Sequence, residues 1–131
     1  MQATPLERKI VNALLAGEHP VLAELREQAA HLSVRSREKT GVGVFTNFEV
    51  DRAGAAPIRR NRVVLGDGVI STPRLQHGAG SALFVENGYI STLEVFTYDE
   101  PWPDDIDDAE LTYTRVPRDL SILNVSDSPP S

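Results

Sequence analysis

The chain contains no cysteine, which excludes disulfide bonds, thiolate metal sites and cysteine nucleophiles. It also has no long apolar run, and its first residues carry no basic head followed by an apolar stretch. We therefore expect neither a secretory signal nor a membrane span, and a cytoplasmic location.

Motifs for catalysis and for cofactors are missing too. Gly41 and Gly43 have neither the third glycine nor the following helix of a dinucleotide-binding loop. His19, His31 and His77 are scattered, without the spacing typical of metal ligands. The serines lack a Gly-x-Ser-x-Gly context. We therefore expect no cofactor and no metal, and the absence of a complete catalytic motif disfavours an enzyme.

The formal net charge is −6, which disfavours general nucleic-acid binding because attraction to phosphate dominates that affinity. Acidic side chains gather between residues 99 and 110, where no basic residue occurs. A surface of this kind suits a basic protein partner, although it also serves solubility alone.

Helical patterns come first along the chain. Thr4, Pro5 and Glu7 form a helix start with a capping box, and Pro20 opens a second apolar stripe that runs to Leu32. The connection between the two is short, so residues 4–32 are predicted to form a helical hairpin.

Strand patterns follow the helices. We expect strands over 42–50, over 62–70 with a bulge at Gly66-Asp67-Gly68, within 81–98, and over 110–116. This order predicts an α+β fold in which the N-terminal helical hairpin packs on a mostly antiparallel sheet of about five to six strands. One domain is expected over 1–119, with the sheet at 34–116 and a C-terminal tail at 120–131.

Asn87-Gly88 predicts a hairpin with a two-residue type I′ turn, because both central residues of that turn need positive φ. The turn places Leu83 opposite Thr92 and Ser81 opposite Glu94. Both faces of this hairpin are apolar, which predicts strands in the middle of the sheet. The face assigned to Glu94 carries Leu83, Val85, Ile90, Thr92, Phe96 and Tyr98.

Glu94 is the first candidate site residue, because a carboxylate among apolar neighbours is costly unless it is paired. It is either a pocket acid that anchors a charged site, or a structural acid that pairs with an arginine. In the first case His77, beside Gly78, would supply acid–base chemistry, and Arg74 would clamp an anion.

Trp102 is the second candidate, because it lies between Pro101 and Pro103, which restrict the backbone on both sides. It either caps the core or anchors an interface with a partner. The acids expected to surround it at such an interface are Asp99, Glu100, Asp104 and Asp105.

Three segments together resemble a group of short bacterial proteins, most of which are called hypothetical proteins. The segments are LLAGEHP (14–20) with the leucines that follow it, TGVGVFT (40–46), and HGAG (77–80) continuing through LFVENGYISTLE to Trp102-Pro103. The resemblance covers about residues 10–103 and implies a shared fold and a bacterial origin. The group brings no established activity or cofactor.

Three functions remain open on this evidence. The first is a small binding protein without catalysis, for example an immunity-like or regulatory partner of a basic toxin or nuclease. The second is an enzyme or small-molecule binder with a pocket near His77 and Glu94. The third is a structural subunit that dimerises through an apolar sheet face.

Overall fold

The computed structural model describes residues 1–103 and 108–124. This part of the chain contains two helices, α1 (Pro5–Leu14) and α2 (Pro20–Ala29), followed by six strands. The strands are β1 (Leu32–Lys39), β2 (Gly43–Val50), β3 (Arg62–Ser71), β4 (Ala79–Glu86), β5 (Tyr89–Thr97) and β6 (Glu110–Tyr113). A short 3-10 helix, η1 (Ser121–Asn124), follows them. The predicted α+β fold is confirmed.

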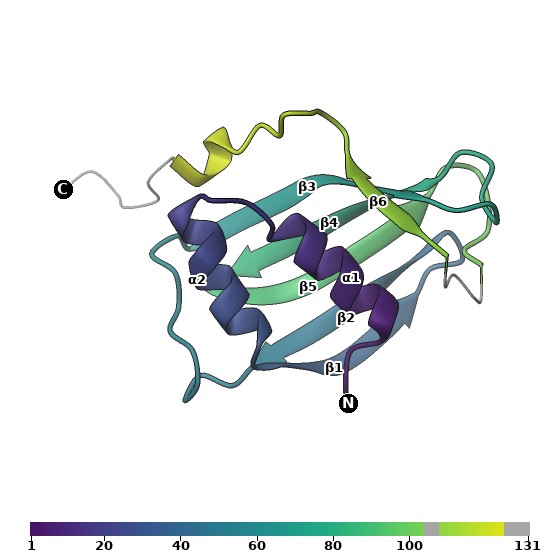
Figure 1. The fold of residues 1–131 in the computed structure, drawn as a ribbon. Helices are drawn as coiled ribbons and strands as arrows, with labels where there is room; N and C mark the ends of the chain where they lie inside the picture. Colours follow the sequence, from purple (N-terminus) through teal and green to yellow (C-terminus); the bar gives the residue numbers. More distant parts are fainter. Residues whose placement is uncertain (104–107, 125–131) are drawn as a thin grey trace.

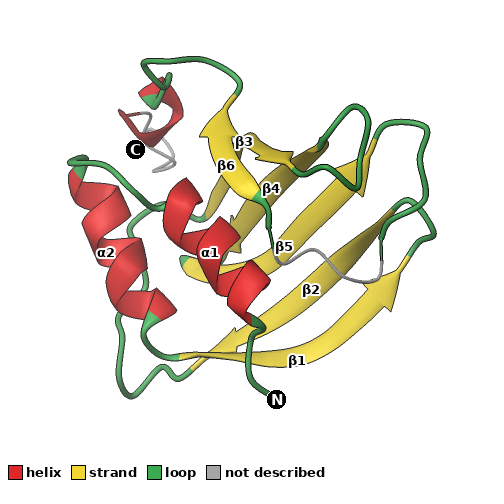
Figure 2. Cartoon of the chain, turned by 45° about the vertical axis from the view of Figure 1, so that its right-hand side comes forward, coloured by secondary structure: helices red, strands yellow, loops and turns green. Residues whose placement is uncertain are grey.

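The strands form one sheet in the order β1-β2-β5-β4-β3-β6, and every neighbouring pair is antiparallel. Both helices lie on the same side of this sheet, α1 over β3, β4 and β6, and α2 over β5 (Figure 1). We call that side the inner face and the opposite side the outer face. No helix or strand of the described residues covers the outer face (Figure 2).

The helices begin as the sequence predicts. Thr4 accepts the backbone N–H of Glu7 at 3.1 Å, and the Glu7 side chain accepts the backbone N–H of Thr4 at 2.7 Å, which completes the capping box. His19 caps α2, because its Nδ1 accepts the N–H of Val21 at 3.1 Å. No helix in the described part of the chain is long and apolar enough to cross a membrane.

The core lies between the helices and the inner face. Ile10, Leu14, Leu22 and Leu25 are at most 1% exposed and pack against inner-face residues of the central strands such as Leu83. Burial of these apolar side chains is the main stabilising contribution to such a two-layer fold.

The predicted hairpin register is correct at the turn and wrong beyond it. Asn87 and Gly88 both have positive φ, 54° and 82°, as the type I′ turn requires. A register shift between Phe84 and Val85 then leaves Ser91 as an extra residue in β5. The resulting pairs are Leu83–Leu93, Ser81–Val95 and Ala82–Glu94 in place of Leu83–Thr92 and Ser81–Glu94.

This bulge at Ser91 moves Thr92, Glu94 and Phe96 to the outer face, away from the inner-face residues Leu83 and Val85. The two strands nevertheless occupy the middle of the sheet, as predicted. The bulge predicted around residues 66–68 is present, since the β3–β4 register shifts between Leu65 and Gly68.

The start of the sheet differs from the expectation. α2 ends at Ala29, and Leu32, assigned to the helical stripe, instead begins β1. β1 is an edge strand whose inner face carries Val34, 4% exposed, and whose pairing with β2 is shifted at Arg35. The Val34 N–H on this edge is held by the carbonyl of Met1 at 2.6 Å.

Candidate functional site

The outer face carries four of the eight aromatic residues of the sequence. Phe45 on β2, Phe84 on β4 and Phe96 on β5 are half-buried there, and Tyr98, just after β5, is 49% exposed. Val64 on β3 adds an aliphatic side chain that is 37% exposed. These side chains lie on a sheet face that no described helix or strand covers, which makes this face a candidate interaction site.

Two of these rings are held in a defined arrangement. Phe96 and Tyr98 meet edge to face, with ring centroids 5.8 Å apart and an interplanar angle of 86°. Both lie over Gly80 on the neighbouring strand, where an added Cβ would come within 2.4 Å of the Phe96 ring and 2.9 Å of the Tyr98 hydroxyl. The glycine therefore lets the rings lie close to the backbone of β4.

A row of hydrogen-bonded polar side chains crosses the outer face from β1 to β5. Asn47 donates to the Ser36 hydroxyl at 2.9 Å and accepts from the Thr92 hydroxyl at 3.0 Å. Because these three side chains satisfy one another, they form a fixed polar boundary beside the aromatic surface.

Glu94 belongs to the neighbouring row of outer-face residues. This second row crosses β1, β2, β5 and β4 as Glu38, Phe45, Glu94 and Ala82. Glu94 is half-buried, and it makes no hydrogen bond or ion pair with any residue of the chain within 1–103 or 108–124. The predicted structural pairing with an arginine is thus not seen among the described residues.

Two other acids, Glu7 and Asp67, are each paired with an arginine. Glu7, 8% exposed, accepts from Arg37 Nε and Nη2 at 2.8 Å each and from the Thr46 hydroxyl at 2.8 Å. Burial alone would raise the pKa of Glu7, but the hydrogen bonds from Arg37, Thr4 and Thr46 and the guanidinium charge hold it below its ordinary value. Hydrogen bonding to Glu7 is in turn the main reason that the pKa of Arg37 is raised above its ordinary value.

Asp67 is engaged in the same way. Its two carboxylate oxygens accept from Arg118 Nε and Nη2 at 2.7 and 2.8 Å. Glu94 differs from Glu7 and Asp67 because no group of the described chain satisfies its half-buried carboxylate.

A hollow of about 640 Å³ opens where β2 and β5 separate beyond the Asn47–Thr92 pair. Its polar lining includes Ser33, Arg35, Glu49, Arg52, Glu86 and Ser91. Arg52 stacks on the ring of Tyr89, with its guanidinium carbon 4.4 Å from the ring centroid. The hollow therefore borders the aromatic surface at the end of the sheet where the Asn87-Gly88 turn lies.

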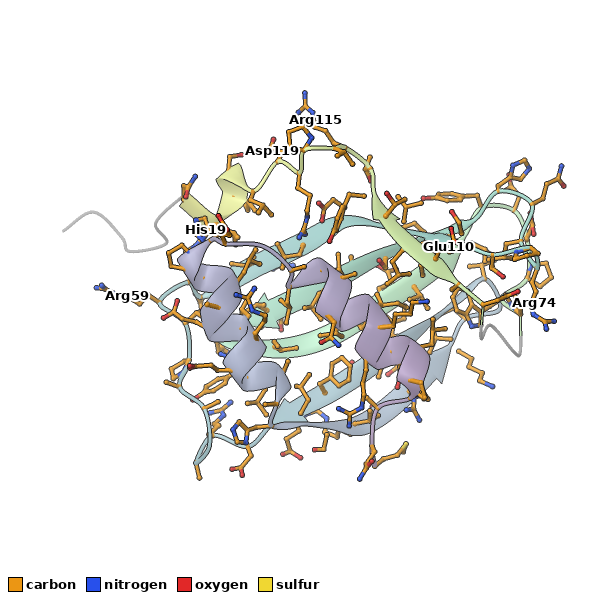
Figure 3. All side chains as sticks on the ribbon, in the orientation of Figure 1. His19, Arg59, Arg74, Glu110, Arg115 and Asp119 are labelled. Carbon is orange, nitrogen blue, oxygen red and sulfur yellow. The ribbon has the colours of Figure 1, made fainter. Side chains whose placement is uncertain are left out.

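The three residues proposed for a catalytic or small-molecule pocket are not brought together. His77 lines a cavity of about 610 Å³ with Thr72, Asp108 and Glu110, whereas Arg74 and Glu94 are not among the residues that line it. About 10 Å of strand separate Ala79, where β4 begins after His77, from Ala82, the cross-strand partner of Glu94. Figure 3 shows Arg74 at the end of the sheet opposite α2.

Trp102 is half-buried against the core, and its backbone N–H donates to the Gly41 carbonyl at 3.0 Å. Glu100 accepts the N–H of Gln76 through both carboxylate oxygens at 3.0 and 3.2 Å, and Asp99 adopts a φ of 63°. This arrangement agrees with the core-capping alternative for Trp102. Asp104 and Asp105 lie outside the described residues.

Among residues 1–103 and 108–124, no group of three or more histidines and acids is placed to hold a metal ion. Comparison with protein-family models, curated proteins and solved structures finds no match to this chain.

Two features of the outer face are not evident in the sequence. The bulge in β5 brings Phe84 to the same face as Glu94, and the pairing of β2 with β5 brings Phe45 there, and neither is indicated by the sequence. Glu38 was also missed, because β1 was not recognised as a strand.

Proposed function

We propose that this protein is a binding module, without catalysis of its own, that docks a basic protein on the outer face of its sheet. The observation that carries the proposal is the half-buried carboxylate of Glu94, which pairs with no described residue, among the half-buried and exposed aromatic side chains of that face. Aromatic side chains are enriched at protein interfaces and give most of their binding energy.

Charge favours a basic partner over a second copy of the chain. The net charge of −6 repels another copy and steers a basic protein to the surface. Arg59, Arg74 and Arg115 also lie at separate places on the periphery, so these three make no common basic patch that a second copy would present (Figure 3). An immunity-like or regulatory protein that neutralises a basic toxin or nuclease is one concrete form of this function.

The test uses two matched substitutions. Val64→Lys places a positive charge on the outer face, and Ile122→Lys places the same charge at a site of similar exposure, 37% against 42%, on η1. Immobilised protein captures partners from a lysate of the source cells, mass spectrometry identifies them, and calorimetry then measures the affinity of each purified partner.

We expect a basic partner whose affinity falls at least about tenfold with Val64→Lys and is unchanged with Ile122→Lys, because a desolvated like charge costs more than about 1.4 kcal/mol. Equal affinity for both variants would overturn the proposal. A concentration-dependent dimer in light scattering that Val64→Lys abolishes would overturn it in favour of self-association.

A further inference from the structure

We propose that the outer-face row Glu38–Phe45–Glu94 receives an arginine side chain of the partner. This inference rests on the proposed function and names the chemistry of its central contact. The register places Glu38 directly opposite Phe45 and Phe45 directly opposite Glu94, on three adjacent strands. Thus one aromatic ring stands between two carboxylates.

The spacing suits a single planar cation. Side chains that lie directly opposite each other on neighbouring strands have Cβ atoms about 5 Å apart, so the two glutamates start about 10 Å apart with the Phe45 ring between them. A guanidinium group on that ring can donate toward both carboxylates at once.

Neither carboxylate is used by the chain itself. Glu38 is exposed, Glu94 is half-buried, and neither makes a hydrogen bond or ion pair with the described residues. A half-buried carboxylate is stabilised when a ligand supplies the opposite charge and hydrogen-bond donors. The row is therefore complementary to a cation.

The neighbours of the row give the site walls. Phe96 lies two residues beyond Glu94 on β5, and Phe84 lies diagonally across from Glu94 on β4. On the side away from Phe96, the hydrogen-bonded row of Ser36, Asn47 and Thr92 runs parallel to it and limits the space. These walls reduce the access of water and so strengthen an ion pair with Glu94.

Arginine fits this surface better than lysine. The guanidinium group is planar, weakly hydrated, stacks on aromatic faces and bonds carboxylates through two parallel N–H groups. The ammonium group of lysine is a strongly hydrated point charge that satisfies only part of this geometry.

The probes are N-acetyl-arginine amide, its uncharged analogue N-acetyl-citrulline amide, and N-acetyl-lysine amide, titrated into the ¹⁵N-labelled protein. We expect the arginine probe to shift the amide resonances of β2 and β5 around Phe45 and Glu94, and to bind several-fold more tightly than lysine. Citrulline should leave these resonances unchanged, because it keeps the shape and loses the charge.

Two substitutions locate the effect. Glu94→Gln should weaken arginine binding by about tenfold, the equivalent of about 1.4 kcal/mol, whereas Glu49→Gln, an exposed acid on the outer face of the neighbouring strand β2, should leave it unchanged. Equal shifts with citrulline, an unaltered affinity in Glu94→Gln, or no response to arginine would each overturn the inference. If Val64→Lys still abolishes capture of a basic partner in that case, the docking face stands and only its arginine contact is wrong.

Discussion

Gln28 on α2 is fully buried, and its side-chain oxygen accepts the backbone N–H of Ile90 on β5 at 2.9 Å. Its amide nitrogen donates to the carbonyls of Ala56 and Gly88 at 3.0 and 2.8 Å. One helical side chain therefore satisfies backbone groups at the hairpin turn and beside the bulge that sets the outer face.

Gln28→Ala should lower the free energy of unfolding by roughly 2–4 kcal/mol, because it leaves buried backbone donors and acceptors without partners. Urea unfolding followed by circular dichroism measures this loss. Glu27→Ala, at an exposed position of the same helix, serves as the control and should change stability by less than about 0.5 kcal/mol. Equal effects of the two substitutions would contradict the structural role of Gln28.

Glu7 should make stability depend on pH. Its folded pKa lies below the ordinary value of 4.5, so its stabilising contribution is fully present above that value and is lost as the pH falls through the folded pKa. Glu7→Gln should therefore be less stable than the original protein at pH 7, and the difference should shrink toward pH 3. Urea unfolding at a series of pH values tests this, and a difference that stays constant with pH would refute it.

Arg118 joins the segment after β6 to the C-terminal end of α1. Besides Asp67, it donates to the carbonyls of Leu14 and Ala16 at 3.1 and 3.0 Å, and its guanidinium carbon lies 4.3 Å from the centroid of the Tyr113 ring. Lysine cannot reproduce this forked contact, so Arg118→Lys should cost about 1–3 kcal/mol.

The same substitution should speed hydrogen exchange in the last turn of α1, which the carbonyl contacts hold. The control is Arg115→Lys, because the Arg115 side chain is 75% exposed and its contact with Asp119 is 3.9 Å long. Such an exposed pair contributes little. Unchanged exchange in Arg118→Lys would argue against this anchoring contact.

Gly80→Ala should displace the Phe96 ring, because the new Cβ would lie 2.4 Å from a ring carbon. The ring can rotate outward, so we expect a stability loss of about 1–3 kcal/mol rather than unfolding. Partner affinity should fall as well, since the aromatic surface changes shape. Gly66→Ala is the matched control, because an added Cβ there meets nothing closer than 3.8 Å.

Local signals in the sequence were sufficient for much of the fold. The capping box at Thr4 and Glu7, the turn at Asn87-Gly88 and the glycine-rich bulge in β3 each depend on residues close in sequence, and each is present. These features could be predicted because their hydrogen bonds and dihedral angles are determined within a few residues.

The features that decide the candidate site are not local. Nothing about Ser91 itself specifies a bulge; the extra residue lets both Ile90 and Leu93 reach the inner face. β1 escaped prediction because four of its eight residues are charged, and its pairing with β2 becomes evident only in the folded sheet. Glu38 and Glu94 fall in one row of the outer face only because of the bulge at Ser91 and the pairing of β1 with β2. The sequence pattern alone therefore did not indicate this row.

The extra residue at position 91 also determines how β5 tolerates changes of length. Replacing Ser91 by another small polar residue preserves the phase of the strand, whereas deleting it would rotate every later side chain by half a period. The deletion would drive Glu94 and Phe96 toward the helices and expel Leu93 and Val95 into water. Between Ile90 and Thr92, the number of residues therefore matters more than their identity.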